Sequence, residues 1–152
     1  MTSFRTLKAD TLDILKLRRP DVAGMLWLNH DASLSLYDTD TFDVYDFTVT
    51  YGATWDGLST PRPLQWFIPS YIEGNSMFNW AGLIHDALYG SALLPKDVAD
   101  DVFRSVLRDA GLSRFRASSA EFWMSKFSKS HYGTEHDRYS IRFHTRMHVT
   151  HR

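Results

Sequence analysis

The hydrophobic pattern of the chain changes its period near the middle, and this change restricts the possible folds more than any other feature. Residues 44–52, VYDFTVTYG, alternate aromatic or aliphatic with polar side chains, which is the period of a strand with one buried face. Residues 77–90 and 95–111 instead repeat apolar side chains every three or four positions, as amphipathic helices do. Strands followed by helices predict an α+β fold.

Two apolar runs in the first half flank a turn-forming tripeptide. Residues 25–28, MLWL, precede Asn-His-Asp, and residues 32–36 then alternate Ala, Ser, Leu, Ser and Leu. Asn and Asp favour tight turns, and the flanking runs favour strands. We therefore expect antiparallel strands at the N-terminal side, with a hairpin formed by these two runs.

A structured loop is predicted between the strands and the helices. The strand over 44–52 stops at Gly52. Residues 54–66, TWDGLSTPRPLQW, then contain the Gly, Pro and Ser typical of an ordered connection. Asp56 and Gly57 in this loop favour a backbone conformation with positive φ.

The helix predicted over 77–90 contains two ionisable residues within the apolar run LIHDALYG at 83–90. His85 shares a helical stripe with apolar residues and is therefore expected to face the core. Gly90 is predicted to cap the C-terminal end of this helix. The inward stripe consists of Phe78, Ala81, His85 and Leu88, with Tyr89 beside it.

The next helix is predicted to begin at Pro95 and to stop at Gly111. Asp100 is an exception in its pattern, because this acidic residue lies on the apolar side of the helix. The expected buried face consists of Ala99, Phe103, Val106, Leu107 and Ala110. The expected solvent face consists of Asp97, Asp101, Arg104 and Arg108.

A third helix is predicted over 117–133, and it ends at Gly133. Residues 139–150, YSIRFHTRMHVT, alternate again and predict a strand. We therefore divide the chain into a single globular domain, 1–133, and a basic C-terminal strand or extended arm, 134–152. The basic side chains near its end are Arg138, Arg142, His144, Arg146, His148, His151 and Arg152.

Length, charge and cysteine content limit the classes of function. A chain of 152 residues is the size of one domain that can bury a core without disulfides or structural metals. The formal net charge of −1 argues against a general polyanion binder, so we expect no nucleic-acid partner. The absence of cysteine excludes thiol chemistry. No apolar segment approaches the length of a membrane span or of a signal-peptide core, which predicts synthesis and folding in the cytoplasm.

Two inward polar residues on consecutive helices, His85 and Asp100, are predicted to meet. A carboxylate that holds an imidazole fixes its tautomer and raises its basicity, which suits a general base that activates water. Tyr89, one turn after His85, is placed to orient Asp100. Asp86 points about 100° away from His85 along the helix, toward the loop with Asp56. These two carboxylates and loop carbonyls would suit a hard cation such as calcium, which would stabilise an oxyanion.

Each of these assignments has a structural alternative. His85 and Asp100 would also form a satisfied core pair, and Asp86 would also be a solvated or capping residue. Asp56 would equally be a turn residue. The basic C-terminal face is expected to be a solvated or partner-facing strand edge rather than a metal or nucleic-acid surface. The aromatic residues expected in the core are Trp66, Phe67, Trp80 and Trp123.

The motifs TWDGLSTPRP, LIHDALYG and KDVADDVF resemble those of a family of uncharacterised domains encoded by tailed bacteriophages and prophages. That pattern is Asp-Gly-x-Ser-x-Pro-Arg, then His-Asp-x-x-Tyr, then Ala-Asp-x-x-Phe, and the match spans about residues 25–133. Trp55 replaces an expected Thr, and the C-terminal strand lies outside the pattern. The matching positions are Asp56, Gly57, Ser59, Pro61, Arg62, His85, Asp86, Tyr89, Ala99, Asp100 and Phe103.

The same residues are similar, over a shorter length, to the bacterial and fungal branch of the phospholipase A(2) superfamily. That similarity implies His85 as the base, Asp100 as its orienting partner and Asp86 with loop carbonyls as the calcium site. The chain lacks the disulfides that usually accompany that fold, and it lacks a secretion signal. Lipolysis would therefore make sense only after delivery outside the cell, for example on a virion.

The resemblances imply two hypotheses of different classes. In the first, the chain is a virion protein of the tail or baseplate that acts by binding and retains a hydrolase-like site. Its partners would be other virion proteins, contacted through the C-terminal arm. In the second, the chain is a hydrolase with a His/Asp dyad that attacks esters or amides of the bacterial envelope, either lipid or cell wall. Both imply synthesis in the host cytoplasm and a final location in the phage particle.

Overall fold

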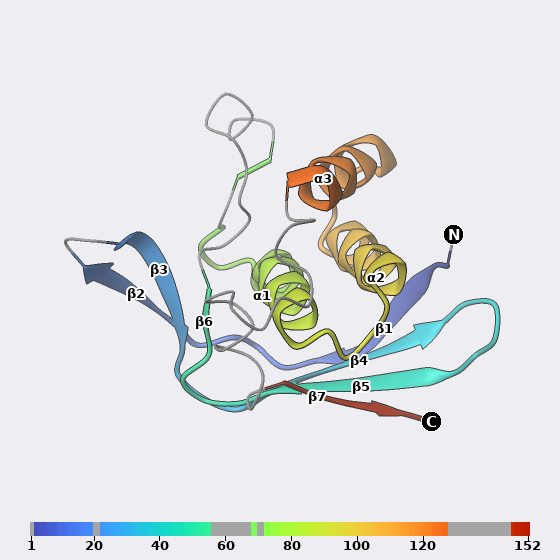
Figure 1. Ribbon diagram of the computed structural model, residues 1–152, viewed down its shortest axis with the longest axis horizontal. Coiled ribbons are helices and arrows are strands. Elements are labelled where there is room, and N and C mark those ends of the chain that lie inside the picture. The colour runs from blue at the N-terminus through green and yellow to red at the C-terminus, as the bar shows by residue number, and fades with distance from the viewer. Residues whose placement is uncertain (1, 20–21, 56–67, 70–71, 128–146) are drawn as a thin grey trace.

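The computed structural model describes residues 2–19, 22–55, 68–69, 72–127 and 147–152. Antiparallel strands come first, three helices follow, and a strand ends the chain, which confirms the predicted α+β fold (Figure 1). The elements, in chain order, are β1 (Phe4–Ala9), β2 (Ile14–Arg19), β3 (Val22–Leu28), β4 (Ala32–Asp38), β5 (Val44–Val49), β6 (Thr54–Trp55), α1 (Ser76–Ser91), α2 (Lys96–Asp109), α3 (Arg114–Phe127) and β7 (Met147–His151).

The described strands form two antiparallel sheets. One has four strands in the order β1-β4-β5-β7, and the other has three in the order β2-β3-β6. In β4, Leu34 and Leu36 are buried while Ser33 is exposed, so one face of the larger sheet is apolar. The helices lie on that face, with α1 next to the sheets and α3 beyond α2 (Figure 1).

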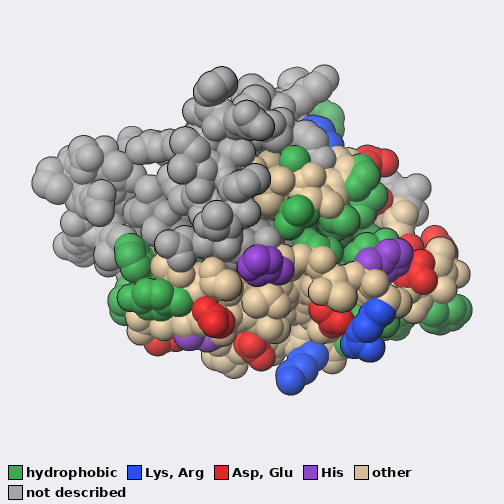
Figure 2. All heavy atoms as spheres, turned by 60° about the horizontal axis from the view of Figure 1, so that its bottom comes forward, with side chains coloured by type: hydrophobic (Ala, Val, Ile, Leu, Met, Phe, Trp, Pro, Cys, Tyr) green, Lys and Arg blue, Asp and Glu red, His purple; other side chains and the backbone are tan. Residues whose placement is uncertain are grey.

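The opposite face of the larger sheet is polar. Ser33 and Thr150 are exposed on it, and Asp46 accepts hydrogen bonds from Ser35 at 2.6 Å and from Arg152 at 2.7 Å. Seen from this side, charged side chains of both signs and histidines are scattered over the lower part of the described surface, and hydrophobic side chains gather at its left end and upper right (Figure 2). The alternation predicted for 44–52 is confirmed over Val44–Val49, where Phe47 and Val49 are buried, but the strand ends there and Tyr51 is exposed.

The hairpin predicted between residues 25–28 and 32–36 is wrong, although both segments are strands. β3 pairs with β2 and β6, whereas β4 pairs with β1 and β5 in the other sheet. The side chains between the two strands do not stabilise a tight turn but accept hydrogen bonds from other segments. His30 accepts from the Asp13 amide, and Asp31 accepts from the Tyr51 amide. The chain therefore passes from one sheet to the other at this point.

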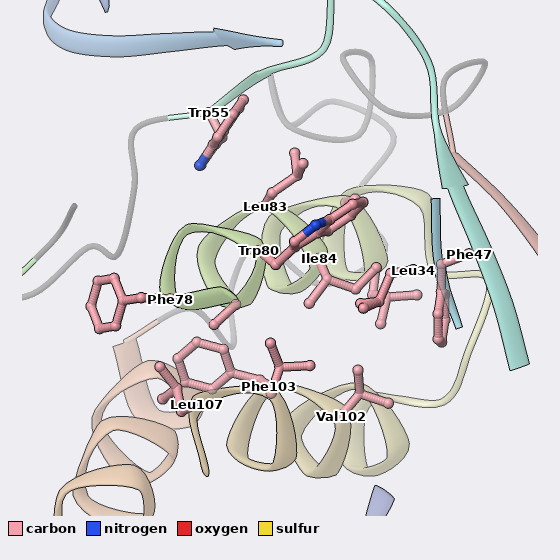
Figure 3. Close-up of a cluster of buried hydrophobic side chains, with 14 of the residues drawn as sticks. Leu34, Phe47, Trp55, Phe78, Trp80, Leu83, Ile84, Val102, Phe103 and Leu107 are labelled. Atoms are coloured by element: carbon pink, nitrogen blue, oxygen red, sulfur yellow. The ribbon is translucent and has the colours of Figure 1, made fainter. Parts of the chain in front are cut away.

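The helix α1 is the centre of the core. Asn75 caps it by accepting a hydrogen bond from the Phe78 amide, and every residue from 78 to 90 is buried. A helix that is buried on all sides must pack against several elements at once. Figure 3 shows side chains of α1, α2 and the sheets filling one continuous core. Trp80 belongs to it as predicted, and its indole N–H donates to the Asp10 carbonyl at 2.7 Å.

The C-cap predicted at Gly90 is wrong. The helix continues to Ser91, and Ala92 takes the left-handed conformation with φ of 52° while its amide donates to the Leu88 carbonyl. Gly90 itself is buried within the helix. A glycine near the end of an apolar run indicates a helix end only approximately, because packing can extend a helix past it.

The predicted ends of the second helix agree with α2, since Pro95 is its N-cap and Gly111 has φ of 101°. The solvent-facing position predicted for Arg104 is wrong, because this residue is only 7% exposed. Its guanidinium lies 3.0 Å from the Asp101 carboxylate and donates to the Thr2 carbonyl at 3.0 Å. The N-terminal strand covers this side of α2, which a helical period alone does not indicate.

The helix α2 also closes the outer edge of β1. Three of its side chains, Asp101, Ser105 and Asp109, accept hydrogen bonds from alternate backbone amides of the first residues of the chain, at 3.0, 3.0 and 2.8 Å. Four residues of helix rise about 6.0 Å and two residues of strand about 6.7 Å, so the two spacings match. The donors are Thr2, Phe4 and Thr6.

The last two predicted elements are described only in part. The third helix begins at Arg114, three residues before the predicted start, and residues 128–133 lie outside the described part of the chain. The strand predicted over 139–150 is described only at its end, where β7 begins at Met147, continues one residue further to His151 and pairs with β5. Trp123 is half-buried, whereas Trp66 and Phe67 are also outside the described residues. No helix among the described residues is long and apolar enough to cross a membrane.

Candidate functional site

The structure brings His85, Tyr89 and Asp100 together, as the sequence predicts. His85 and Tyr89 are one turn apart on α1, and Asp100 faces them from the first half of α2. The His85 Nε2 atom lies 3.7 Å from Asp100 Oδ1, and the Tyr89 hydroxyl donates a short hydrogen bond to the same carboxylate oxygen. All three residues are buried.

Asp86 approaches the other side of the imidazole. Its Oδ1 atom lies 3.7 Å from His85 Nδ1, so the ring is placed between two carboxylates. Asp86 is buried, which excludes the alternative of a solvated helix residue. Both 3.7 Å separations exceed a direct hydrogen bond, and among the described residues neither ring nitrogen has a hydrogen-bond partner. The attraction between His85 and the carboxylates is therefore electrostatic.

Lys96 is a member of this network that the sequence analysis missed. Its Nζ atom lies 2.9 Å from Asp100 Oδ2, and it is also 5.6 Å from the centre of the Tyr89 ring. The Lys96 side chain is 27% exposed, so it links the network to solvent. The spacing of four residues between Lys96 and Asp100 on one helix is the only sequence feature that could have indicated the pair.

Burial and the neighbouring charges shift the pKa values of His85 and Asp100 in opposite directions. Burial by itself lowers the pKa of His85, but the Asp100 and Asp86 carboxylates outweigh it and hold the pKa above its ordinary value. Burial raises the pKa of Asp100, but His85, Tyr89 and Lys96 together hold it below its ordinary value. Both shifts favour the charged forms of His85 and Asp100, and with the formal charges of Lys96 and Asp86 the network then has no net charge.

The His85 ring is enclosed by aromatic side chains. Its centre lies 4.1 Å from that of Tyr89 and 4.7 Å from that of Phe103, and only 1% of the residue is exposed. A general base must be unprotonated and must reach its substrate or a water molecule. His85 is enclosed, and its raised pKa favours the protonated form, so the arrangement favours a structural network over a catalytic base.

The proposed metal ligands are only partly described. Asp56 lies outside the described residues, so the structure places Asp86 alone of the two. No group of three or more His, Asp or Glu residues able to hold a metal ion occurs within 2–19, 22–55, 68–69, 72–127 and 147–152. The calcium hypothesis therefore depends on the loop around Asp56.

These features define a class of protein: an α+β domain with a buried, charge-balanced His–Asp–Tyr–Lys network between two helices. The family described as "Protein of unknown function (DUF1353)" matches residues 33–124, which is more than half of the chain. The chain belongs to this family. The matched segment contains β4 to most of α3, and with them every described residue of the network. No curated protein and no solved structure matches the chain.

Proposed function

We propose that the protein is a component of a tailed-phage particle, in its tail or baseplate, and that it acts by binding and assembly. In this proposal the His–Asp network stabilises the fold and is a hydrolase-like site without a catalytic role. The single observation that supports a structural role is the burial of His85, which is 1% exposed between two carboxylates. The assignment to a phage particle is supported by the motif resemblance.

The partners in this proposal are other virion proteins, contacted through the C-terminal residues 134–152. β7 is the part of this arm that the structure describes, and it forms an edge of the larger sheet with His148 and Thr150 exposed. An exposed edge strand is a common attachment point for a strand of another protein. The chain would be made in the host cytoplasm and retained in the particle.

A second candidate function is hydrolysis of esters or amides of the bacterial envelope. The observation in its favour is that Asp100 faces His85, as the resemblance to phospholipases implies, and that Tyr89 donates a hydrogen bond to the Asp100 carboxylate. Asp86, with Asp56 and loop carbonyls, would then bind calcium. Because His85 is enclosed, this activity would require an opening of the site before water could reach the ring.

One experiment separates these functions. Hydrolysis of labelled phospholipids and of purified cell-wall fragments is measured for wild type, for His85→Ala and for a control, His148→Ala, with calcium or with chelator. Thermal unfolding of all three proteins is recorded in parallel. His148 is an exposed histidine remote from the network in sequence and lies on β7.

For the binding proposal we expect no hydrolysis by any of the three proteins, together with a lowered melting temperature for His85→Ala alone. Hydrolysis by wild type and by His148→Ala, abolished in a folded His85→Ala variant, would refute it and establish the hydrolase. The particle role is tested separately: deletion of residues 134–152 from the phage-encoded chain should prevent its incorporation into purified particles. Unchanged incorporation would contradict the arm as the point of attachment.

A further inference from the structure

The two edge strands of the larger sheet, β1 and β7, differ in how they are covered. At β1, α2 side chains accept hydrogen bonds from three backbone amides, and the strand has a register shift between Thr6 and Lys8. Cover by a helix, a bulge and charged residues are the usual devices that prevent an edge from pairing with another chain. The β1 edge is therefore protected against association.

Within the described part of the chain, the β7 edge shows none of these devices. β7 pairs with β5 without a register shift, from Tyr45 opposite His151 to Val49 opposite Met147. Residues 147–152, MHVTHR, contain neither proline nor lysine. Arg152, which directly follows β7, is paired with Asp46 at 2.7 Å. Among the described elements β7 has no neighbour on its outer side.

The backbone groups that point outward follow from the hydrogen-bond pattern. Val44 and Arg152 exchange two hydrogen bonds, of 2.7 and 2.8 Å, so the Arg152 backbone faces β5. In an antiparallel ladder the direction alternates along the strand, so Thr150 and His148 also face β5. The amides and carbonyls of Met147, Val149 and His151 therefore point away from the sheet.

This outward set is symmetric about Val149. A second copy that approaches antiparallel, with a twofold axis at Val149, would place Val149 opposite Val149 of the second copy. Met147 and His151 would then lie opposite each other twice, and each of the three pairs would exchange two backbone hydrogen bonds. On the polar face His148 would lie opposite Thr150, so within residues 147–151 no two like charges lie opposite each other.

We propose that the β7 edge binds a second copy of this chain, antiparallel about Val149, and joins two four-stranded sheets into one. The inference does not depend on the virion role, because the association can be measured with the purified chain. It names the chain itself as the first partner of the C-terminal strand.

The test uses the full chain and two variants at one position. The Val149 amide points outward, so Val149→Pro removes a donor that β5 does not use, and proline is tolerated on edge strands. Val149→Ala retains the amide and is the matched control. The mass of each protein in solution is measured by sedimentation over a concentration range up to about 100 μM.

We expect wild type and Val149→Ala to form dimers with increasing concentration and Val149→Pro to remain a monomer. A wild type that stays monomeric, or a Val149→Pro variant that still forms dimers, would overturn the proposal. Amide hydrogen exchange of wild type provides a measurement that does not depend on the folding of a variant. The amides of Met147, Val149 and His151 should become protected as concentration rises, and equal exchange at all concentrations would also refute the dimer.

Discussion

Replacement of Asp100 by Asn tests the charge balance of the buried network. The substitution keeps the shape of the side chain but removes a negative charge that faces Lys96 at 2.9 Å and His85 at 3.7 Å. The network would lose one of its two negative charges, and His85 and Lys96 would lose the carboxylate between them. Removal of one partner of a buried ion pair typically costs about 3–5 kcal/mol, because the remaining charge is left uncompensated.

The expected cost lies at the lower end of that range, at about 3 kcal/mol. Lys96 is 27% exposed and can be partly resolvated, and Asn can still accept the hydrogen bond of Tyr89. For a chain of this size about 3 kcal/mol corresponds to a decrease in melting temperature of about 6–12 °C. The free energy of unfolding is measured by denaturant titration at pH 7, followed by tryptophan fluorescence.

The matched control is Asp97→Asn, an exposed carboxylate in the first turn of the same helix. Its interaction with the helix dipole is worth at most about 1 kcal/mol, so its loss should be small. A stability of Asp100→Asn within about 0.5 kcal/mol of wild type, the range of an ordinary surface change, would refute the charge-balance argument. An equal loss for both variants would refute it as well, because the effect would then belong to the helix and not to the network.

Three further predictions follow from other features. The stability of wild type should be greatest between the lowered pKa of Asp100 and the raised pKa of His85. It should fall as pH rises through the His85 pKa and as pH falls through the Asp100 pKa. Melting temperatures measured across this pH range test the prediction, and a flat profile would refute it. Arg104→Met should lower the free energy of unfolding by about 3 kcal/mol, because Asp101 loses its buried cation, whereas Arg114→Met on the surface should stay within about 0.5 kcal/mol. Phe42 has φ of 63° and is 75% exposed, so Phe42→Asn should raise the melting temperature through a gain of about 0.5–1 kcal/mol, and a decrease would show that the aromatic ring stabilises the turn.

Local periodicity was sufficient to predict β3, β4, β5 and the helices, but β1, β2 and β6 were not predicted, and the strand partners were not predicted either. The alternation in residues 44–52 identified β5, and the helical period identified α1 and α2, because each pattern depends on one buried face. The pairing of β3 and β4 was predicted wrongly because both strands present an apolar face of similar length, and only tertiary contacts decide which strand lies beside which. The His30 and Asp31 side chains bind Asp13 and Tyr51, and such contacts are not visible in a local pattern.

The candidate site was predictable where an ionisable residue interrupts an apolar stripe. His85 and Asp100 both stand out in this way, and their proximity follows from the packing of consecutive helices. Lys96 does not stand out, because a lysine in the first turn of a helix is usually exposed to solvent. Arg104 was predicted to be exposed for the same reason, because a charged side chain in a helical pattern is usually assigned to the solvent face. Only its contact with Thr2 shows that the N-terminal residues cover this side of α2.

The helix α2 connects the network to the protected edge of the sheet. Asp100 and Asp101 are adjacent, so their side chains point about 100° apart. Asp100 completes the buried charges around His85, whereas Asp101, with Ser105 and Asp109, accepts the amides of β1. Loss of the Asp100 interactions would loosen the same helix that prevents β1 from pairing with another chain. A buried ion network is weak evidence for stability alone. In this fold it also fixes the helix that covers the β1 edge of the larger sheet, whose other edge strand is β7.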